Sequence, residues 1–318
     1  MTHPPGPTSP FPDSADLLAR ALPACPGCAC AGGLGRRGFT FGLLGAGTAI
    51  ALPARGRDGV SVGEQSRFSK LVPAGQIEQA AVQQYGQLLT QARSQRALAP
   101  ESHPQLVRLR AIAQRLIPFA ETWNPRARQW RWEVNLLGSN QVNAFCMPGG
   151  KIAFFFGILD RLKLSDDEVA MIMGHEMAHA LREHARERVG KSTATNIGAN
   201  VLSSLLGLGG LGNAVLGASS QLLSLTWSRS DETEADTVGL DLAARAGYDP
   251  RAGVTLWQKM GGASKSGGQS APPQWLSTHP SGPSRIREIE ANLPRVLPLY
   301  QRSDKPKQRY GPPGATER

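Results

Sequence analysis

The residues with the clearest chemical meaning are His175, Glu176 and His179, which form the pattern H-E-x-x-H. In a helix, positions four residues apart share a face, so both imidazoles can bind one metal ion. Glu176 follows the first histidine and can take a proton from a water molecule at that ion. The neighbouring residues between Val169 and Leu181 are mostly apolar, which predicts a buried helix. A divalent metal would compensate the cost of burying these polar side chains.

A catalytic zinc ion usually has three protein ligands, so a third ligand is expected elsewhere in the chain. The segment 228–236 is rich in acidic residues, and their positions around a helix place them on different faces. Glu232 and Asp236 fall on a face that is otherwise small or apolar, whereas Glu234 falls on a polar face. We therefore expect Glu232 to bind zinc and Asp236 to orient a ligand imidazole through its second nitrogen.

The same residues also allow two interpretations without a metal. The histidines can form a buried, hydrogen-bonded pair, and the two acidic residues can form a buried salt bridge with Arg229 or Arg285. Outside the metal set, His184 and Glu234 are expected at the protein surface.

Apolar periodicity and turn residues predict the elements that hold this site. Helices are expected within 75–122 (interrupted at Pro100 and Pro104), from Ser165 to about Arg188, at 232–246, after Asp249-Pro250, and at 283–293. Strands are expected at 131–137, 142–147 and 151–159, with a tight turn at Pro148-Gly149-Gly150. The expected fold is α+β and mostly helical, with a small β-sheet.

Four motifs in order resemble family forty-eight of the metallopeptidases, the group of HtpX and the CAAX prenyl proteases. They are the segment Val142–Lys151, His175–His179, Glu232-x-x-Ala235-Asp236, and His279-Pro280 followed by Arg285. The first motif resembles the soluble periplasmic branch typified by BepA and LoiP. The resemblance covers about residues 75–295. It implies a zincin-like (gluzincin) domain with one zinc ion held by His175, His179 and Glu232, and with Glu176 as the base.

The resemblance also suggests residues that contact the substrate. His279 or Arg285 is expected to donate to the oxyanion of the reaction. Alternatively, His279 binds zinc in a resting state, or it only caps the last helix. An extended substrate is expected to pair, as an added strand, with Val142, Asn143, Ala144 and Phe145.

Residues 1–51 are expected to be a leader. Arg36 and Arg37 precede a short Gly- and Ala-rich stretch ending in Ala49-Ile50-Ala51, which resembles a twin-arginine export signal with a cleavage site. This signal predicts a periplasmic location that allows membrane association, and the alternative is a chance arginine pair beside a linker. The remaining expected boundaries are a linker at 52–74, a zinc metallopeptidase domain at 75–300, and a basic flexible tail at 301–318.

Composition restricts the classes of function. The 318 residues are 40% hydrophobic and 19% charged, as in a globular protein. The net charge of +10 is spread along the chain, and no basic helix contains interleaved aromatic residues, so no nucleic-acid partner is expected. The uncharged segment 192–228 allows a peripheral membrane contact, although its glycines favour a soluble helical hairpin. No pattern specifies an oligomeric state.

These observations predict a zinc-dependent metalloendopeptidase. The expected substrates are unfolded or misassembled envelope proteins, cleaved in periplasmic protein quality control. One alternative is a latent peptidase that acts mainly as a client-binding chaperone or assembly factor. A second alternative is an exopeptidase.

Overall fold

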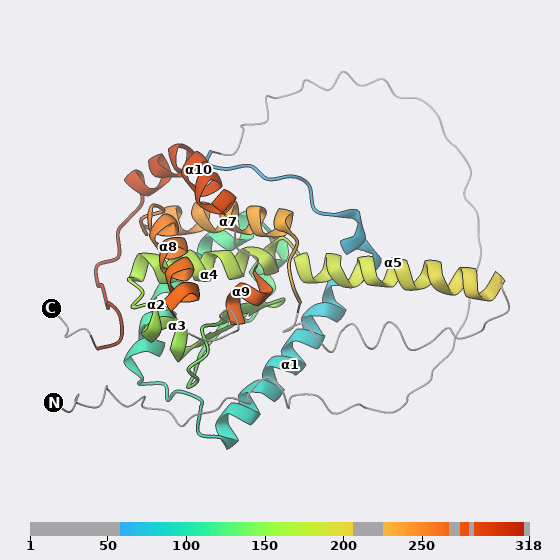
Figure 1. The fold of residues 1–318 in the computed structure, drawn as a ribbon, viewed down its shortest axis with the longest axis horizontal. Helices are drawn as coiled ribbons and strands as arrows, with labels where there is room; N and C mark the ends of the chain where they lie inside the picture. The colour runs from blue at the N-terminus through green and yellow to red at the C-terminus, as the bar shows by residue number, and fades with distance from the viewer. Residues whose placement is uncertain (1–57, 206–224, 267–273, 280–282, 315–318) are drawn as a thin grey trace.

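The computed structural model describes residues 58–205, 225–266, 274–279 and 283–314 (Figure 1). The helices in these ranges are α1 (Ala74–Ser94), α2 (Pro104–Leu116), α3 (Phe156–Arg161), α4 (Asp166–Leu181), α5 (His184–Leu205), α7 (Arg229–Arg245), α8 (Ala252–Ser266), α9 (Gln274–Thr278) and α10 (Pro283–Arg302). The strands are β1 (Glu133–Leu137), β2 (Ala144–Met147) and β3 (Lys151–Phe155). This confirms the expected mostly helical α+β fold with a small sheet.

Helices α4 and α7 lie side by side at the centre of the molecule (Figure 1). Helix α10 packs on α7, and strand β2 packs on α4 from the other side. Every residue of α4 from Glu168 to Leu181 is buried, as its apolar sequence predicts. The H-E-x-x-H residues therefore lie between the sheet and the C-terminal helices.

The sheet presents β2 as an edge strand. Its order is β1-β3-β2, with β1 parallel to β3 and β2 antiparallel to β3. The predicted turn joins β2 and β3, and it requires glycine because Gly149 and Gly150 have φ values of +83° and +77°. The third strand is shorter than predicted, because the chain turns into α3 at Phe156.

Helix α4 begins where the sequence predicts and ends earlier. The side chain of Ser165 accepts from the backbone N–H of Glu168, and the carboxylate of Glu168 accepts from the backbone N–H of Ser165. The expected continuation to Arg188 was wrong, because Glu183 has φ of +59° and interrupts the helix before α5 begins at His184. In Figure 1, α5 extends away from the central helices.

The C-terminal part of the chain is more regular than the sequence suggested. Helix α10 continues through Pro294 and Pro298 to Arg302, well beyond the predicted end at residue 293. Residues 303–314 fall within the expected tail, and part of this segment lies against the start of α4. There the backbone N–H groups of Tyr310 and Gly311 donate to the carboxylate of Asp166.

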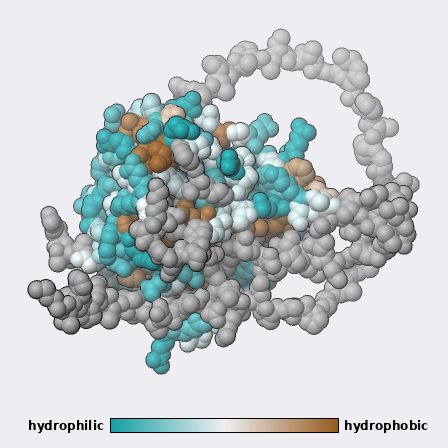
Figure 2. All heavy atoms as spheres, viewed as in Figure 1, coloured by the Kyte–Doolittle hydropathy of each residue, from teal (hydrophilic) through white to brown (hydrophobic). Residues whose placement is uncertain are grey.

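The structure does not address the expected leader. Residues 1–51, including the arginine pair and its expected cleavage site, lie outside the described residues, as does the segment 206–224 of the uncharged stretch. Among the helices that the structure describes, none has the length and apolar character to cross a membrane. On the face drawn in Figure 2, hydrophilic residues surround small hydrophobic patches.

Candidate metal centre

Four buried side chains meet between α4, α7 and α9. His175 and His179 come from α4, Glu232 from α7, and His279 directly follows α9. One donor atom from each of these residues lies within 4.8 Å of the others, which is compatible with one metal ion. Two or three imidazoles with one carboxylate are a donor set that suits zinc. The sequence predicted three of these residues as ligands and left the role of His279 open.

His175 is held in place from the side opposite the donor cluster. Its Nδ1 atom lies 2.9 Å from Oδ1 of Asp236, and its Nε2 atom lies 3.2 Å from Nδ1 of His279. The guanidinium of Arg285 donates to both oxygens of Asp236, at 2.7 and 2.6 Å, and also to Glu232. Asp236 is therefore placed to fix the His175 ring, as its helical position predicted.

Arg285 is buried and pairs with two carboxylates of the site. Only 4% of its surface is exposed, and its guanidinium is engaged by Glu232 and Asp236. It also packs over the ring of Trp257, with 3.9 Å between Cζ and the ring centroid. Arg285 therefore neutralises two buried carboxylates, and its expected role as an oxyanion donor stays a prediction.

Charge in the cluster favours metal binding. Burial raises the pKa of Glu232, but the hydrogen bonds to His179 and His279 and the charges of His175 and His279 together lower that pKa by more, so the carboxylate is ionised. Burial holds the pKa of His179 well below its usual value, so this imidazole is neutral at pH 7. Burial lowers the pKa of His175 too, but Asp236 and Glu232 raise it above its usual value. A metal ion at this site would therefore compete with a proton for His175.

Glu176 lies at the edge of the cluster and is almost fully enclosed. The indole N–H of Trp275 donates to its Oε1 atom over 2.7 Å, and Nε2 of His279 lies 3.5 Å from the same oxygen. The ring of Trp275 also stacks on His279, with 4.8 Å between the centroids. Trp275 is not predicted from the sequence, because no local pattern links it to a residue 99 positions earlier.

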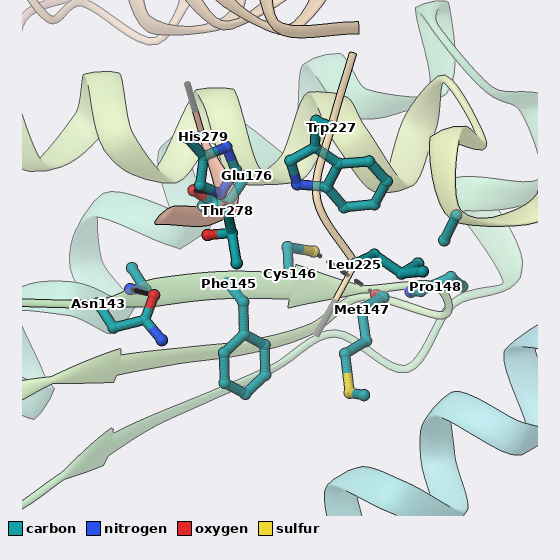
Figure 3. Close-up of a pocket in the computed structure, with 12 residues that line it drawn as sticks. Asn143, Phe145, Cys146, Met147, Pro148, Glu176, Leu225, Trp227, Thr278 and His279 are labelled. Carbon is teal, nitrogen blue, oxygen red and sulfur yellow. Dashed lines mark hydrogen bonds and ion pairs between the residues drawn. The ribbon is translucent and has the colours of Figure 1, made fainter. Parts of the chain in front are cut away.

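A pocket of about 40 Å³ opens between Glu176 and the edge strand β2. Cys146, Pro148, Leu225, Trp227 and His279 are among the residues that line it (Figure 3). In this view Phe145 points to the other side of the strand, away from Glu176. Its ring instead packs edge-on against Tyr85 of α1.

The segment 142–145, which was expected to bind substrate, contacts both α9 and β3. The backbone carbonyl of Val142 accepts from the backbone N–H of Trp275 over 3.0 Å. The Asn143 carbonyl accepts from Phe155 of β3 over 3.1 Å, and Ala144 is buried. The edge of β2 therefore lies directly beside α9.

His184 was expected at the surface but contacts the metal cluster, and Glu234 in turn contacts His184. His184 is only 2% exposed, and its Nδ1 atom lies 2.9 Å from Nδ1 of His179. Glu234 lies 3.4 Å from the other nitrogen of His184 and accepts from Arg182. The break at Glu183 brings His184 against His179, which a continuous helix from α4 would not do.

Comparisons with known proteins agree with this geometry. The model of "Peptidase family M48" matches residues 102–293. The mitochondrial metalloendopeptidase OMA1 of Arabidopsis thaliana is 44% identical, over 54% of this chain and 34% of that protein. The OMA1 protein of Schizosaccharomyces pombe is 33% identical, over 65% of this chain and 58% of that protein. The beta-barrel assembly-enhancing protease of Escherichia coli is 26% identical, over 53% of this chain and 36% of that protein. The chain thus spans less than two thirds of each of these relatives.

The comparisons correct the expected location. The prediction of twin-arginine export to the periplasm was wrong, since the two more similar of these relatives are named as mitochondrial proteins. An arginine pair beside a short Gly- and Ala-rich stretch is a weak motif, which a chain rich in these residues can carry without an export function. The BepA and LoiP branch is not specifically supported either, since the E. coli protein is less similar than the OMA1 proteins.

Proposed function

Because this chain belongs to peptidase family M48, we propose that it is a zinc-dependent endopeptidase that cleaves unfolded or misassembled proteins. The observation that carries this proposal is the position of Glu176, beside a buried cluster of four metal-binding side chains. The same carboxylate lines the pocket beside the edge strand. The base Glu176, the candidate metal site and the edge of β2 therefore lie next to one another.

Each residue of the site has a separate task in the proposed reaction. His175, His179 and Glu232 hold the metal, and Asp236 fixes the ring of His175. A zinc ion bound there supplies Lewis-acid chemistry that polarises the peptide carbonyl and favours attack by water at neutral pH. Glu176 takes the proton of the attacking water and delivers it to the nitrogen of the leaving amine.

The substrate is proposed to bind as an extended chain along β2. An edge strand recognises mainly the backbone of an added strand, which suits segments that lack stable structure. The apolar lining from Leu225, Trp227 and Pro148 favours an apolar substrate side chain next to the cleaved bond. The chain would cut within a polypeptide, since this mode of binding requires no free terminus.

One observation favours a second candidate, a latent peptidase that mainly binds clients. Nδ1 of His279 lies 2.9 Å from Glu232 and 3.2 Å from His175, so His279 occupies a position within the donor cluster. Glu176 is only 2% exposed beneath it. In this arrangement a substrate carbonyl cannot reach the metal position until His279 moves.

Digestion of casein by the full chain tests the proposal, with Glu176→Gln as the paired variant and both proteins loaded with zinc. We expect cleavage at internal bonds by the parent and none by the variant, which keeps the shape of the base but not its basicity. Bound zinc without cleavage by either protein would contradict the endopeptidase and favour the latent form. His279→Ala then separates these states, because it would restore cleavage only to a latent enzyme.

A further inference from the structure

A chain of polar contacts leads from the metal cluster to the surface on the side away from Asp236. Nδ1 of His179 lies 2.9 Å from Nδ1 of His184, and Nε2 of His184 lies 3.4 Å from Oε2 of Glu234. Arg182 donates to the other oxygen of Glu234. The side chain of His184 is 1% exposed and that of Glu234 is 25% exposed, so the contacts run from buried to partly solvated.

From this geometry we propose that His184 and Glu234 are positioning residues for the metal ligand His179. The inference rests on the proposed zinc site and adds the residues that hold its second imidazole. His175 is held directly by the carboxylate of Asp236. His179 is held by a carboxylate through an intervening imidazole.

The backbone is shaped to make this contact. In a continuous helix, a residue five positions after His179 would lie roughly 140° around the axis and could not meet its ring. The helix instead breaks after Arg182, and Glu183 adopts φ of +59°, a conformation that is unfavourable for a residue with a Cβ atom. His184 thereby becomes the first residue of α5 and faces His179.

Only one arrangement of protons satisfies the contacts and leaves a lone pair for the metal. Nε2 of His179 faces the cluster, 3.3 Å from Glu232 and 3.1 Å from Nε2 of His175. Its N–H must then be at Nδ1 and donate to Nδ1 of His184, whose own N–H at Nε2 donates to Glu234. A carboxylate at the end of such a chain fixes the ligand ring and strengthens its donor atom.

Zinc affinity of the full chain, measured by competition with a chelator, tests this inference. We expect His184→Ala and Glu234→Ala to weaken zinc binding about ten- to a hundredfold, the usual effect of removing a group that supports a ligand. Glu234→Gln should recover most of the affinity, because its amide oxygen still accepts from His184. Glu187→Gln on α5, which removes a partly buried ion pair with Lys191 that touches no member of the donor cluster, is the matched control and should bind zinc like the parent.

A second measurement separates positioning from loss of structure. The visible spectrum of bound cobalt(II) should change in His184→Ala, whereas the thermal midpoint of the metal-free protein should stay close to that of the parent. If His184→Ala is not folded, the comparison of Glu234→Gln with Glu234→Ala decides the question. Equal zinc affinity in the parent and in both alanine variants would overturn the inference alone. Absence of zinc binding by the parent would overturn the proposed function together with it.

Discussion

Gly174 of α4 and Gly239 of α7 face each other so closely that neither position has room for a Cβ atom. A Cβ atom at Gly174 would lie 2.9 Å from the carbonyl oxygen of Gly239, and one at Gly239 would lie 2.8 Å from the backbone nitrogen of His175. Both obstacles are backbone atoms, which cannot rotate away as side chains do. This contact sets the separation of the two helices that carry His175 and Glu232.

Gly239→Ala should therefore push α7 away from α4. We expect a loss of about 2 kcal/mol in the free energy of unfolding, measured with urea, and weaker zinc binding by chelator competition. Gly86→Ala is the control, because Gly86 lies in α1 with no atom near its Cβ position. That variant should gain about 0.5–1 kcal/mol from reduced backbone freedom. A Gly239→Ala protein as stable as the parent would show that the two helices can separate at no cost.

Removal of Arg285 should be strongly destabilising. Arg285→Met leaves the buried carboxylates of Glu232 and Asp236 without their cation, and breaking a buried pair in this way costs about 3–5 kcal/mol. Urea unfolding of the metal-free protein measures this loss. Arg287→Met, at an exposed position of the same helix, should leave the unfolding free energy nearly unchanged. An equally small effect at both positions would mean that the carboxylates are neutral without metal.

The hydrogen bond from Trp275 to Glu176 should be important for turnover. Trp275→Phe keeps an aromatic ring beside His279 but removes the N–H that holds the carboxylate, and hydrogen bonds to charged groups contribute about 1.5–3 kcal/mol. We expect kcat on a peptide substrate to fall about tenfold, with KM and bound zinc unchanged. Trp257→Phe is the control, since Trp257 packs against Trp275 at 5.2 Å between the centroids. Equal kcat values for the two variants would contradict the role of Trp275 in orienting Glu176.

Glu78 should contribute to stability in a pH-dependent way. Burial raises the pKa of Glu78, but the hydrogen bonds from Arg126 and Trp130 and the charges of Arg126 and Arg186 together lower it by more, so the net pKa lies below the usual 4.5. The stabilisation is therefore complete above pH 4.5 and is lost as the pH falls through the lowered pKa. Urea midpoints of the parent and Glu78→Gln should differ at pH 7 and converge as the pH decreases below 4. A constant difference over that range would contradict this assignment, and the exposed Glu64→Gln is the control.

The sequence predicted the features that depend on local spacing. The four-residue spacing of His175 and His179, the helical phase of Glu232 and Asp236, and the capping box at Ser165 each follow from the geometry of one helix. Two glycines that follow a proline likewise marked the turn between β2 and β3. These features carry the donor cluster, which explains why three of its members could be named before the fold was known.

The sequence did not predict features that depend on contacts between distant segments. The left-handed conformation of Glu183 is unfavourable locally, so only tertiary packing maintains the break that brings His184 to His179. The partnership of Trp275 with Glu176, and of Arg285 with both carboxylates, joins residues 49 to 99 positions apart. The prolines of α10 misled the prediction of its end, although the helix has a strongly one-sided apolar face that packs on α7 and α8.

The late position of Arg285 in the chain has a consequence for biosynthesis. During synthesis, both ligand histidines and Glu232 emerge well before α10, and Asp166 emerges long before the residues near 310 that cover it. A nascent chain that ends before α10 contains the base and three ligands. It lacks Arg285, the cation that offsets the free-energy cost of burying Glu232 and Asp236. The centre would thus assemble only after α10 has been synthesised and has packed on α7.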